Sequence, residues 1–257
     1  MANRVIKKRA KVESKVEKIA FLSDLHIPYQ SKRALEIVLN FLGDYNANHI
    51  ILGGDIFDCY QVSDYSRDPG RTLTLQDEFD HGRPFIEAID YLAPKVSFML
   101  GNHEDRLQRL IGRNPGLYNL RALKLSVAAE LPKAWKFYPS QAQLQLGNLT
   151  VLHGDLRELG SGGINPARTM FNKLKRSSLF GHFHRFASHY DTNYNGDVRI
   201  TQGNGHLSDL AQVCYMTAPD WQMGITTVEV CGSGAFAIQP RIIDRRGLLA
   251  DGKEYSL

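Results

Sequence analysis

Residues of the types that bind metal ions occur in five short blocks, and each block directly follows a run of apolar residues. In chain order the blocks are Asp24-Leu25-His26, Gly53-Gly54-Asp55, Gly101-Asn102-His103-Glu104, His153-Gly154-Asp155 and Gly181-His182-Phe183-His184. Carboxylates, imidazoles and amide oxygens are common ligands of divalent metals. Together the blocks supply enough donors for two ions that share one carboxylate, an arrangement used to hydrolyse phosphate esters.

Short strands must bring these blocks together. The apolar runs 19–23, 49–52, 96–100, 149–152 and 178–180 each end at a block, which is typical of buried strands. Apolar residues at helical spacing predict helices over 32–45 and around 85–92, and Asn165 followed by Pro166 predicts a helix reaching about residue 176. This alternation indicates an α/β sheet, in which residues at the carboxyl ends of neighbouring strands converge on one crevice.

The last third of the chain has a different pattern. Residues 187–244 are rich in Val, Ile, Thr and Tyr, with Asn195-Gly196 as a hairpin signal. We expect a second group of mostly antiparallel strands here, which completes a two-sheet sandwich with helices outside.

Length and composition fit one globular domain. The chain has 257 residues, 43% of them hydrophobic, and no apolar stretch near the ~20 residues that a membrane span needs. No secretory signal is recognisable at the amino terminus, so a cytoplasmic protein is expected. The three cysteines are odd in number and widely spaced, which argues against a disulfide framework.

The positive charge of the chain is concentrated in residues 1–18. This segment holds seven Lys or Arg and two Glu. Of the 31 basic and 27 acidic residues in the whole chain, 24 basic and 25 acidic residues therefore lie in residues 19–257. We expect a flexible basic tail over 1–18 and a single domain over 19–257. The tail could hold nucleic acid through phosphate contacts, or be a solvated terminus.

The five blocks, in this order, resemble the motifs of the calcineurin-like metallophosphoesterase superfamily: D-x-H, G-D, G-N-H-[DE], H and G-H-x-H. The resemblance extends from Asp24 to His184. It implies a two-sheet αββα sandwich and a metal-dependent phosphoesterase.

The resemblance also implies which residues hold the metals. The first ion would be held by Asp24, His26, Asp55 and His184. The second ion would be held by Asp55, Asn102, His153 and His182. Only the Asp55 carboxylate would therefore be shared between the two ions. The mixed nitrogen and oxygen ligands suit Mn best among the candidates, with Fe, Zn, Ni or Co as alternatives.

Two further residues receive catalytic roles from the resemblance. His103 matches the histidine that protonates the leaving oxygen, and the nucleophile would be a hydroxide bridging the metals. Asp58 matches a carboxylate that orients this imidazole in part of the family, although it could be a turn residue with no catalytic task. His206 matches no block and could line the site or belong to a turn.

At two positions the sequence differs from branches of the superfamily, and these differences restrict the class of substrate that is expected. Cys59 stands where protein phosphatases carry an arginine that grips phosphate, and His103 stands where lipid-precursor pyrophosphohydrolases carry an arginine. The phosphodiesterase and nuclease branch, including small phosphoesterases of phages and bacteria, fits better. A phosphomonoesterase or nucleotide pyrophosphatase on the same site is an alternative, and a non-catalytic scaffold is another.

Substrate contacts are expected in two insertions. Residues 59–84 contain several arginines and tyrosines, and Arg106, Arg109 and Arg113 share one helix face just beyond His103. This arginine stripe could bind the flanking phosphates of a nucleic acid, or be a solvated helix face.

Overall fold

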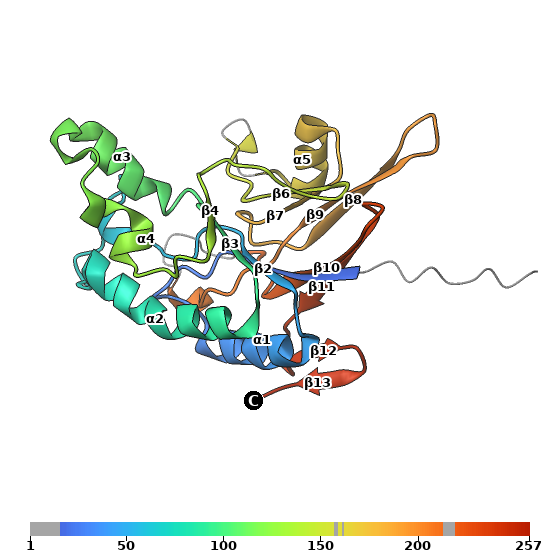
Figure 1. Cartoon of the computed structure of the whole chain (residues 1–257), viewed down its shortest axis with the longest axis horizontal. Coiled ribbons are helices and arrows are strands. Elements are labelled where there is room, and N and C mark those ends of the chain that lie inside the picture. The colour runs from blue at the N-terminus through green and yellow to red at the C-terminus, as the bar shows by residue number, and fades with distance from the viewer. Residues whose placement is uncertain (1–15, 157–158, 161, 213–218) are drawn as a thin grey trace, which may run out of the picture.

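Two β-sheets packed face to face form the centre of this computed structural model, which describes residues 16–156, 159–160, 162–212 and 219–257. The first sheet has six strands in the order β11-β10-β1-β2-β3-β4, and the second has five in the order β5-β6-β7-β9-β8. In Figure 1, α1 and α2 lie on one side of the sheets and α5 on the other. The expected αββα sandwich is therefore confirmed.

The first sheet combines a parallel and an antiparallel part. The strands β1, β2, β3 and β4 are mutually parallel, while β10 and β11 extend the sheet in antiparallel fashion next to β1. The bounds are β1 Val16–Leu22, β2 His49–Leu52, β3 Val96–Met99, β4 Lys136–Tyr138, β10 Gly224–Cys231 and β11 Phe236–Ile242. A small hairpin of β12 (Leu248–Ala250) and β13 (Lys253–Tyr255) follows β11.

The second sheet is half parallel. Its central strands β6, β7 and β9 are parallel, and β5 and β8 add antiparallel edges. The bounds are β5 Leu144–Leu146, β6 Leu149–Leu152, β7 Ser178–Phe180, β8 Ala187–Thr192 and β9 Val198–Gly203. The strands expected after residue 187 are present and divide between the two sheets. β8 and β9, joined by the expected turn at Asn195-Gly196, enter the second sheet, and β10 and β11 enter the first.

The helices connect and cover these strands. Their bounds are α1 Lys32–Tyr45, α2 Leu75–Leu92, α3 Asp105–Arg113, α4 Leu125–Ala128 and α5 Pro166–Leu174, with short 3-10 turns at Tyr60–Val62, Pro115–Leu117, Arg121–Leu123 and Leu210–Gln212. Ser31 caps α1 and Asn165 caps α5, since each side chain accepts a hydrogen bond from a backbone N–H of the first turn. Among the described residues, no helix is both long and apolar enough to cross a lipid bilayer.

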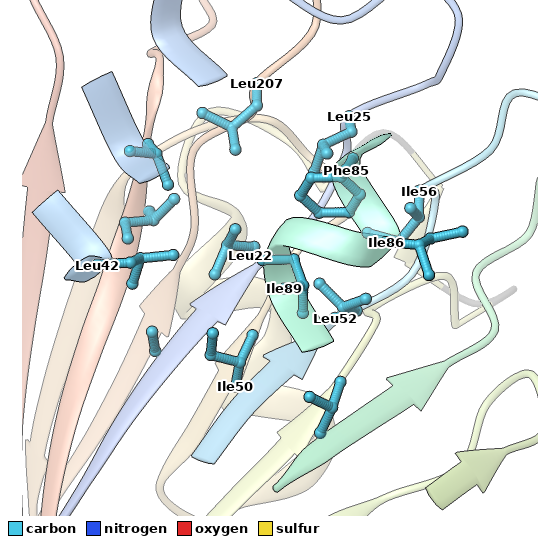
Figure 2. Close-up of a cluster of buried hydrophobic side chains, with 14 of the residues drawn as sticks. Leu22, Leu25, Leu42, Ile50, Leu52, Ile56, Phe85, Ile86, Ile89 and Leu207 are labelled. Carbon is cyan, nitrogen blue, oxygen red and sulfur yellow. The ribbon is translucent and has the colours of Figure 1, made fainter. Parts of the chain in front are cut away.

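Side-chain alternation along the strands produces the layers. In β1, Ile19 and Phe21 belong to the core between the sheets, whereas Ala20 and Leu22 belong to the core under α1 and α2. Figure 2 shows strand residues such as Leu22 and Leu52 beside Phe85, Ile86 and Ile89 of α2. A third, smaller cluster lies between the second sheet and α5. Because both faces of the central strands are buried, their carboxyl ends are held in fixed positions.

Part of the expected tail belongs to the domain. Residues 16–18 form the start of β1 and pair with β10, with Val16 opposite Cys231. The rest of the predicted tail, residues 1–15, lies outside the described residues. Cys59 and Cys231 are free thiols, and Cys214 is not among the described residues.

Candidate metal centre

The loops after five strands meet at one edge of the sandwich. These loops follow β1, β2 and β3 in the first sheet and β6 and β7 in the second, and they carry the five sequence blocks. A hydrogen bond crosses between the sheets here, because the backbone N–H of His182 donates to the Asp24 carboxylate at 3.0 Å. The sequence blocks are thus brought together by the carboxyl ends of the strands, as expected.

Asp24, His26 and His184 form a first group of ligand atoms, all within 4.8 Å of one another. The Nε2 atoms of His26 and His184 lie 3.2 Å apart, and His184 Nε2 lies 3.1 Å from Asp24 Oδ1. All three side chains are buried. They correspond to three of the four ligands expected for the first ion.

Asp55, His153 and His182 form a second group of the same kind. His153 Nε2 lies 3.2 Å from Asp55 Oδ2 and 3.2 Å from the amide oxygen of Asn102. Asp55 also groups with His26 and His103, so its carboxylate reaches towards both sets. The structure therefore gathers all seven predicted ligands, and Asp55 occupies the position between the two groups.

The orientation of the rings fits divalent cations. His153 Nδ1 lies 2.8 Å from the carbonyl oxygen of Gly53 and donates a proton to it, which leaves a lone pair on Nε2. That lone pair faces two oxygen atoms. His26 Nδ1 likewise donates to Asp58 at 3.0 Å, so its Nε2 lone pair faces His184. Lone pairs directed at one another repel unless a proton or a cation lies between them, and this donor set suits a transition metal.

Charges within the cluster shift the pKa values in opposite directions. Burial disfavours charge on His153, but the Asp55 carboxylate outweighs burial and raises the histidine pKa to about 10. Burial also opposes ionisation of Asp24, but His184 lowers the pKa of this carboxyl to about 2. In His182, burial and the charge of His153 lower the pKa to about 4. Protons thus balance the carboxylates, and a bound metal would displace them.

Most of the ligand candidates sit in an unfavourable backbone conformation. Five of the seven have a φ angle in the left-handed region, which non-glycine residues rarely adopt: Asp24 (60°), His26 (53°), Asp55 (53°), His182 (68°) and His184 (59°). Such residues persist where the surroundings determine their conformation, and they concentrate at functional sites. Here the backbone N–H groups of Asp24 and His26 are fixed by the carbonyls of Gly54 and Asp55, both at 3.0 Å.

Two motif glycines allow the ligands to approach the backbone. A Cβ atom at Gly101 would lie 2.2 Å from Asp55 Oδ1. A Cβ atom at Gly181 would lie 2.6 Å from Ser23 Oγ and 2.7 Å from Asp24 Oδ2. Any side chain at either position would displace a ligand carboxylate, which explains why the motifs carry glycine there.

His103 lies at the edge of the cluster with Asp58 behind it. Its Nδ1 is 2.9 Å from Asp58 Oδ1, and its Nε2 is 3.8 Å from Asp55 Oδ2. The His103 side chain is 16% exposed, so solvent reaches it. Burial works against the charge of Asp58, but hydrogen bonds from His103 and His26 hold the pKa of this carboxyl well below its usual range. The proton on His103 Nδ1 is thereby fixed, and Nε2 faces the metal ligands.

The three arginines of the predicted stripe occupy different environments. Arg106 is buried; it donates to the Asp58 carbonyl at 2.8 Å, and its Nη2 lies 3.1 Å from His103 Nε2. Arg109 donates to the carbonyl of Asn102 at 3.1 Å, and Arg113 pairs with Asp64 at 2.5 Å. Their role as substrate contacts stays a prediction, and Arg106 is the one placed beside His103.

Comparison with known families agrees with this geometry. A family model described as calcineurin-like phosphoesterase matches residues 17–212, which is most of the chain and includes every block. The chain belongs to the calcineurin-like phosphoesterases. Members of this family bind two divalent metals, and the two groups of ligand atoms are the candidate positions for them.

Solved structures resemble the chain only distantly. Vps29 from Cryptosporidium parvum is 14% identical, with 90% of this chain and 99% of that chain covered and a TM-score of 0.45. A dimetal phosphatase from Danio rerio is 10% identical, with 93% and 99% covered and a TM-score of 0.44. Comparison with curated protein sequences gave no match. At these identities and scores the resemblance says nothing about the activity of this phosphoesterase.

Glu104 has a role in this phosphoesterase that the sequence analysis did not assign. Its buried carboxylate accepts hydrogen bonds from the backbone N–H groups of Asp55, Ile56, Phe57 and Gly101, at 2.7–3.0 Å. Burial raises the Glu104 pKa to about 7. The carboxylate joins the loops after β2 and β3 and so holds Asp55 in place. In the sequence, the acidic residue at the fourth position of the G-N-H-[DE] motif was the feature from which this role could have been predicted.

His206 lies behind the first ligand group. It is fully buried, stacks on His184 with ring centroids 5.4 Å apart, and hydrogen bonds Ser208 Oγ through Nδ1 at 2.7 Å. Burial lowers its pKa to about 3. Of the two interpretations left open by the sequence, His206 lines the site from behind, as a neutral support for His184.

Proposed function

We propose that this phosphoesterase hydrolyses phosphodiesters of a nucleic acid or nucleotide at a two-metal centre, with His103 as the general acid. The observation that carries the proposal is the Asp58–His103 pair beside Asp55. Its Nε2 lies at the edge of the ligand cluster, 3.8 Å from Asp55 Oδ2, while Nδ1 is fixed at 2.9 Å from the Asp58 carboxylate.

The protein residues around the metals have separate tasks. Bound divalent metals would polarise the phosphoryl oxygens and lower the pKa of a water molecule. Glu104 and the backbone keep Asp55 in place. In the structure Arg106 Nη2 donates to His103 Nε2, so Nε2 must first release this contact and take up a proton from solvent. The resulting imidazolium delivers that proton to the leaving oxygen, and Asp58 keeps the ring oriented for this transfer. The guanidinium of Arg106, next to Nε2, stabilises negative charge that develops there.

The preference for a diester over a monoester rests on the presence of a cysteine at position 59. This residue occupies the sequence position of the phosphate-gripping arginine of protein phosphatases, and its side chain is fully buried. A monoester dianion would therefore lack a charge-assisted, bidentate partner at this position. A diester carries one negative charge and depends less on such a contact. Arg106 does not replace the missing arginine fully, because its Nη1 is already bound to the carbonyl of Asp58.

A substrate panel tests the proposal. The purified protein is assayed on bis- and mono-p-nitrophenyl phosphate, cyclic nucleotides, and single- and double-stranded DNA and RNA, each with Mn²⁺, Ni²⁺, Zn²⁺ and Mg²⁺. We expect metal-dependent hydrolysis with diesters ahead of the monoester. Faster cleavage of the monoester would support a phosphomonoesterase instead. No hydrolysis of any substrate by protein that has bound two metals would support a non-catalytic scaffold.

A further inference from the structure

A pocket adjoins the metal centre on the side of the first ligand group. The pocket is small, with a volume of about 30 Å³, and it is bordered by the ligand candidates His26 and His184. Tyr29, Arg71 and Trp221, which lie outside the five sequence blocks, also line it. A substituent on a phosphate bound at the metals would therefore lie over these three side chains, at the mouth of the pocket.

Arg71 is held in a defined orientation at this pocket. The central carbon of its guanidinium lies 4.3 Å from the ring centroid of Tyr29 and 4.8 Å from that of Tyr60. Its backbone is fixed as well, since Gln61 Nε2 donates to the Arg71 carbonyl at 2.9 Å. Aromatic faces and a planar cation are thus stacked along one wall.

Trp221 is equally well anchored. Its ring lies 4.1 Å from that of His184, at an interplanar angle of 78°. The two neighbouring residues are both tied down: Asp220 pairs with Arg185 at 2.9 Å, and Gln222 donates its backbone N–H to the His184 carbonyl at 3.0 Å. The indole itself is only half-buried. A large aromatic surface is therefore presented to the pocket directly beside a metal ligand.

We propose that Tyr29, Arg71 and Trp221 form a nucleoside subsite, which binds the base of the nucleotide whose phosphodiester is cleaved. The inference rests on the proposed diesterase function and specifies its substrate. Nucleobases stack on aromatic rings and on arginine planes, and such stacking tolerates any base because every base has a π-face. Alkyl or glycerol substituents have no flat face and gain little from this wall. Asp209, also at the pocket, supplies a hydrogen-bonding carboxylate.

Two chromogenic diesters with the same leaving group test the subsite. One is the p-nitrophenyl ester of thymidine 5′-monophosphate and the other is ethyl p-nitrophenyl phosphate. We expect kcat/KM at least about ten-fold higher for the thymidine ester, and the ratio should fall about ten-fold in Trp221→Ala and in Arg71→Ala. A variant that only damages the metal centre lowers both activities together and leaves the ratio unchanged. Tyr194→Ala and Arg246→Ala, exposed positions outside the pocket lining, are the matched controls.

Calorimetry provides a test that does not need turnover. Thymidine 5′-monophosphate should bind the metal-loaded protein about ten-fold more tightly than inorganic phosphate, and Trp221→Ala should remove this difference. Equal affinities for the two ligands in the wild type would overturn the subsite, as would an unchanged kinetic ratio in both variants. If neither ester is hydrolysed, the diesterase function fails, and the calorimetric comparison still decides whether the subsite exists.

Discussion

Two buried histidines at opposite ends of the strands show what distinguishes a ligand from a core residue. His153 follows the carboxyl end of β6, and His49 is the first residue of β2; both are 1% exposed. Yet their pKa values shift in opposite directions. Next to Asp55 the pKa of His153 rises despite its burial, whereas burial, together with Lys95, lowers that of His49 to about 3.

The difference lies in the partners of each ring. At the carboxyl ends of the strands, His153 faces a carboxylate and an amide oxygen, with its other nitrogen fixed by a carbonyl. At the amino end, His49 Nε2 meets the hydroxyl of Ser97 at 2.9 Å. Burial therefore does not identify a metal ligand. A ligand is marked by oxygen and nitrogen atoms that converge on one point, where either shared protons or a cation must lie between them.

Replacing Asp55 with Asn should have the largest effect, because it removes the carboxylate charge that raises the pKa of His153 above that of His49. Both candidate metal positions lose the negative charge of the shared carboxylate, so metal affinity at each should fall by more than the roughly 10–100-fold that removal of an outer contact costs. Turnover should fall by at least the same factor. Metal content of the purified variant, alongside Asp44→Asn as an exposed control, checks this. Two full equivalents of metal with unchanged turnover would refute the bridging role.

His103→Ala separates chemistry from metal binding at the same edge of the sheet. Because His103 is assigned to proton transfer, the variant should keep its metals and lose about 10²–10⁴-fold in turnover. The loss should be smaller for p-nitrophenyl esters, whose leaving group needs little protonation, than for alkyl or nucleoside esters. An equal loss on both classes would leave His103 with electrostatic stabilisation only.

The metal ligands could be predicted from sequence because each follows a short buried strand. Parallel pairing places the ends of β1, β2 and β3 side by side, so local sequence is enough to bring Asp24, Asp55 and Asn102 together. The destination of the later strands could not be predicted in this way. Pairing of β10 with β1 joins residues about two hundred positions apart, and the alternation within β10 is compatible with either sheet.

The side chains that surround the ligand cluster could not be predicted from the sequence either. Helical spacing put three arginines on one face of α3, but it could not show that Arg106 turns inward to His103 while Arg113 reaches Asp64. Trp221 carried no signal at all, since its position depends on contacts with His184 and on ion pairing of its neighbour. Tertiary contacts of single side chains decide these positions, and no local periodicity reports them.

Substitutions along the arginine stripe should have graded effects. Arg106→Ala removes a guanidinium that touches His103, so turnover should fall by about 10–100-fold, as for other loss of an outer contact. Arg109→Ala and Arg113→Ala should cost less, because these side chains contact the Asn102 carbonyl and Asp64 instead. If the substrate is a polynucleotide, each lost phosphate contact should reduce the salt slope of binding by about one. Salt titrations with a His103→Ala background measure this; flat slopes in every variant would argue against nucleic acid.

The smallest effect is expected at the other end of β2, where His49 should make the fold sensitive to acid without any metal. The pKa of His49 is about 3 in the folded chain and 6.5 in the unfolded chain, so between these pH values the unfolded chain binds a proton that the folded chain does not bind. Stability from this residue is fully present above pH 6.5 and is lost as the pH falls from 6.5 towards 3. Between pH 7.5 and 5.5, wild type should lose about 1 kcal/mol more unfolding free energy than His49→Gln. Urea unfolding with EDTA present isolates the effect, because the metal-site histidines are common to both proteins. Equal losses in wild type and variant would mean that Glu17, 3.8 Å from His49 Nδ1, already compensates its charge.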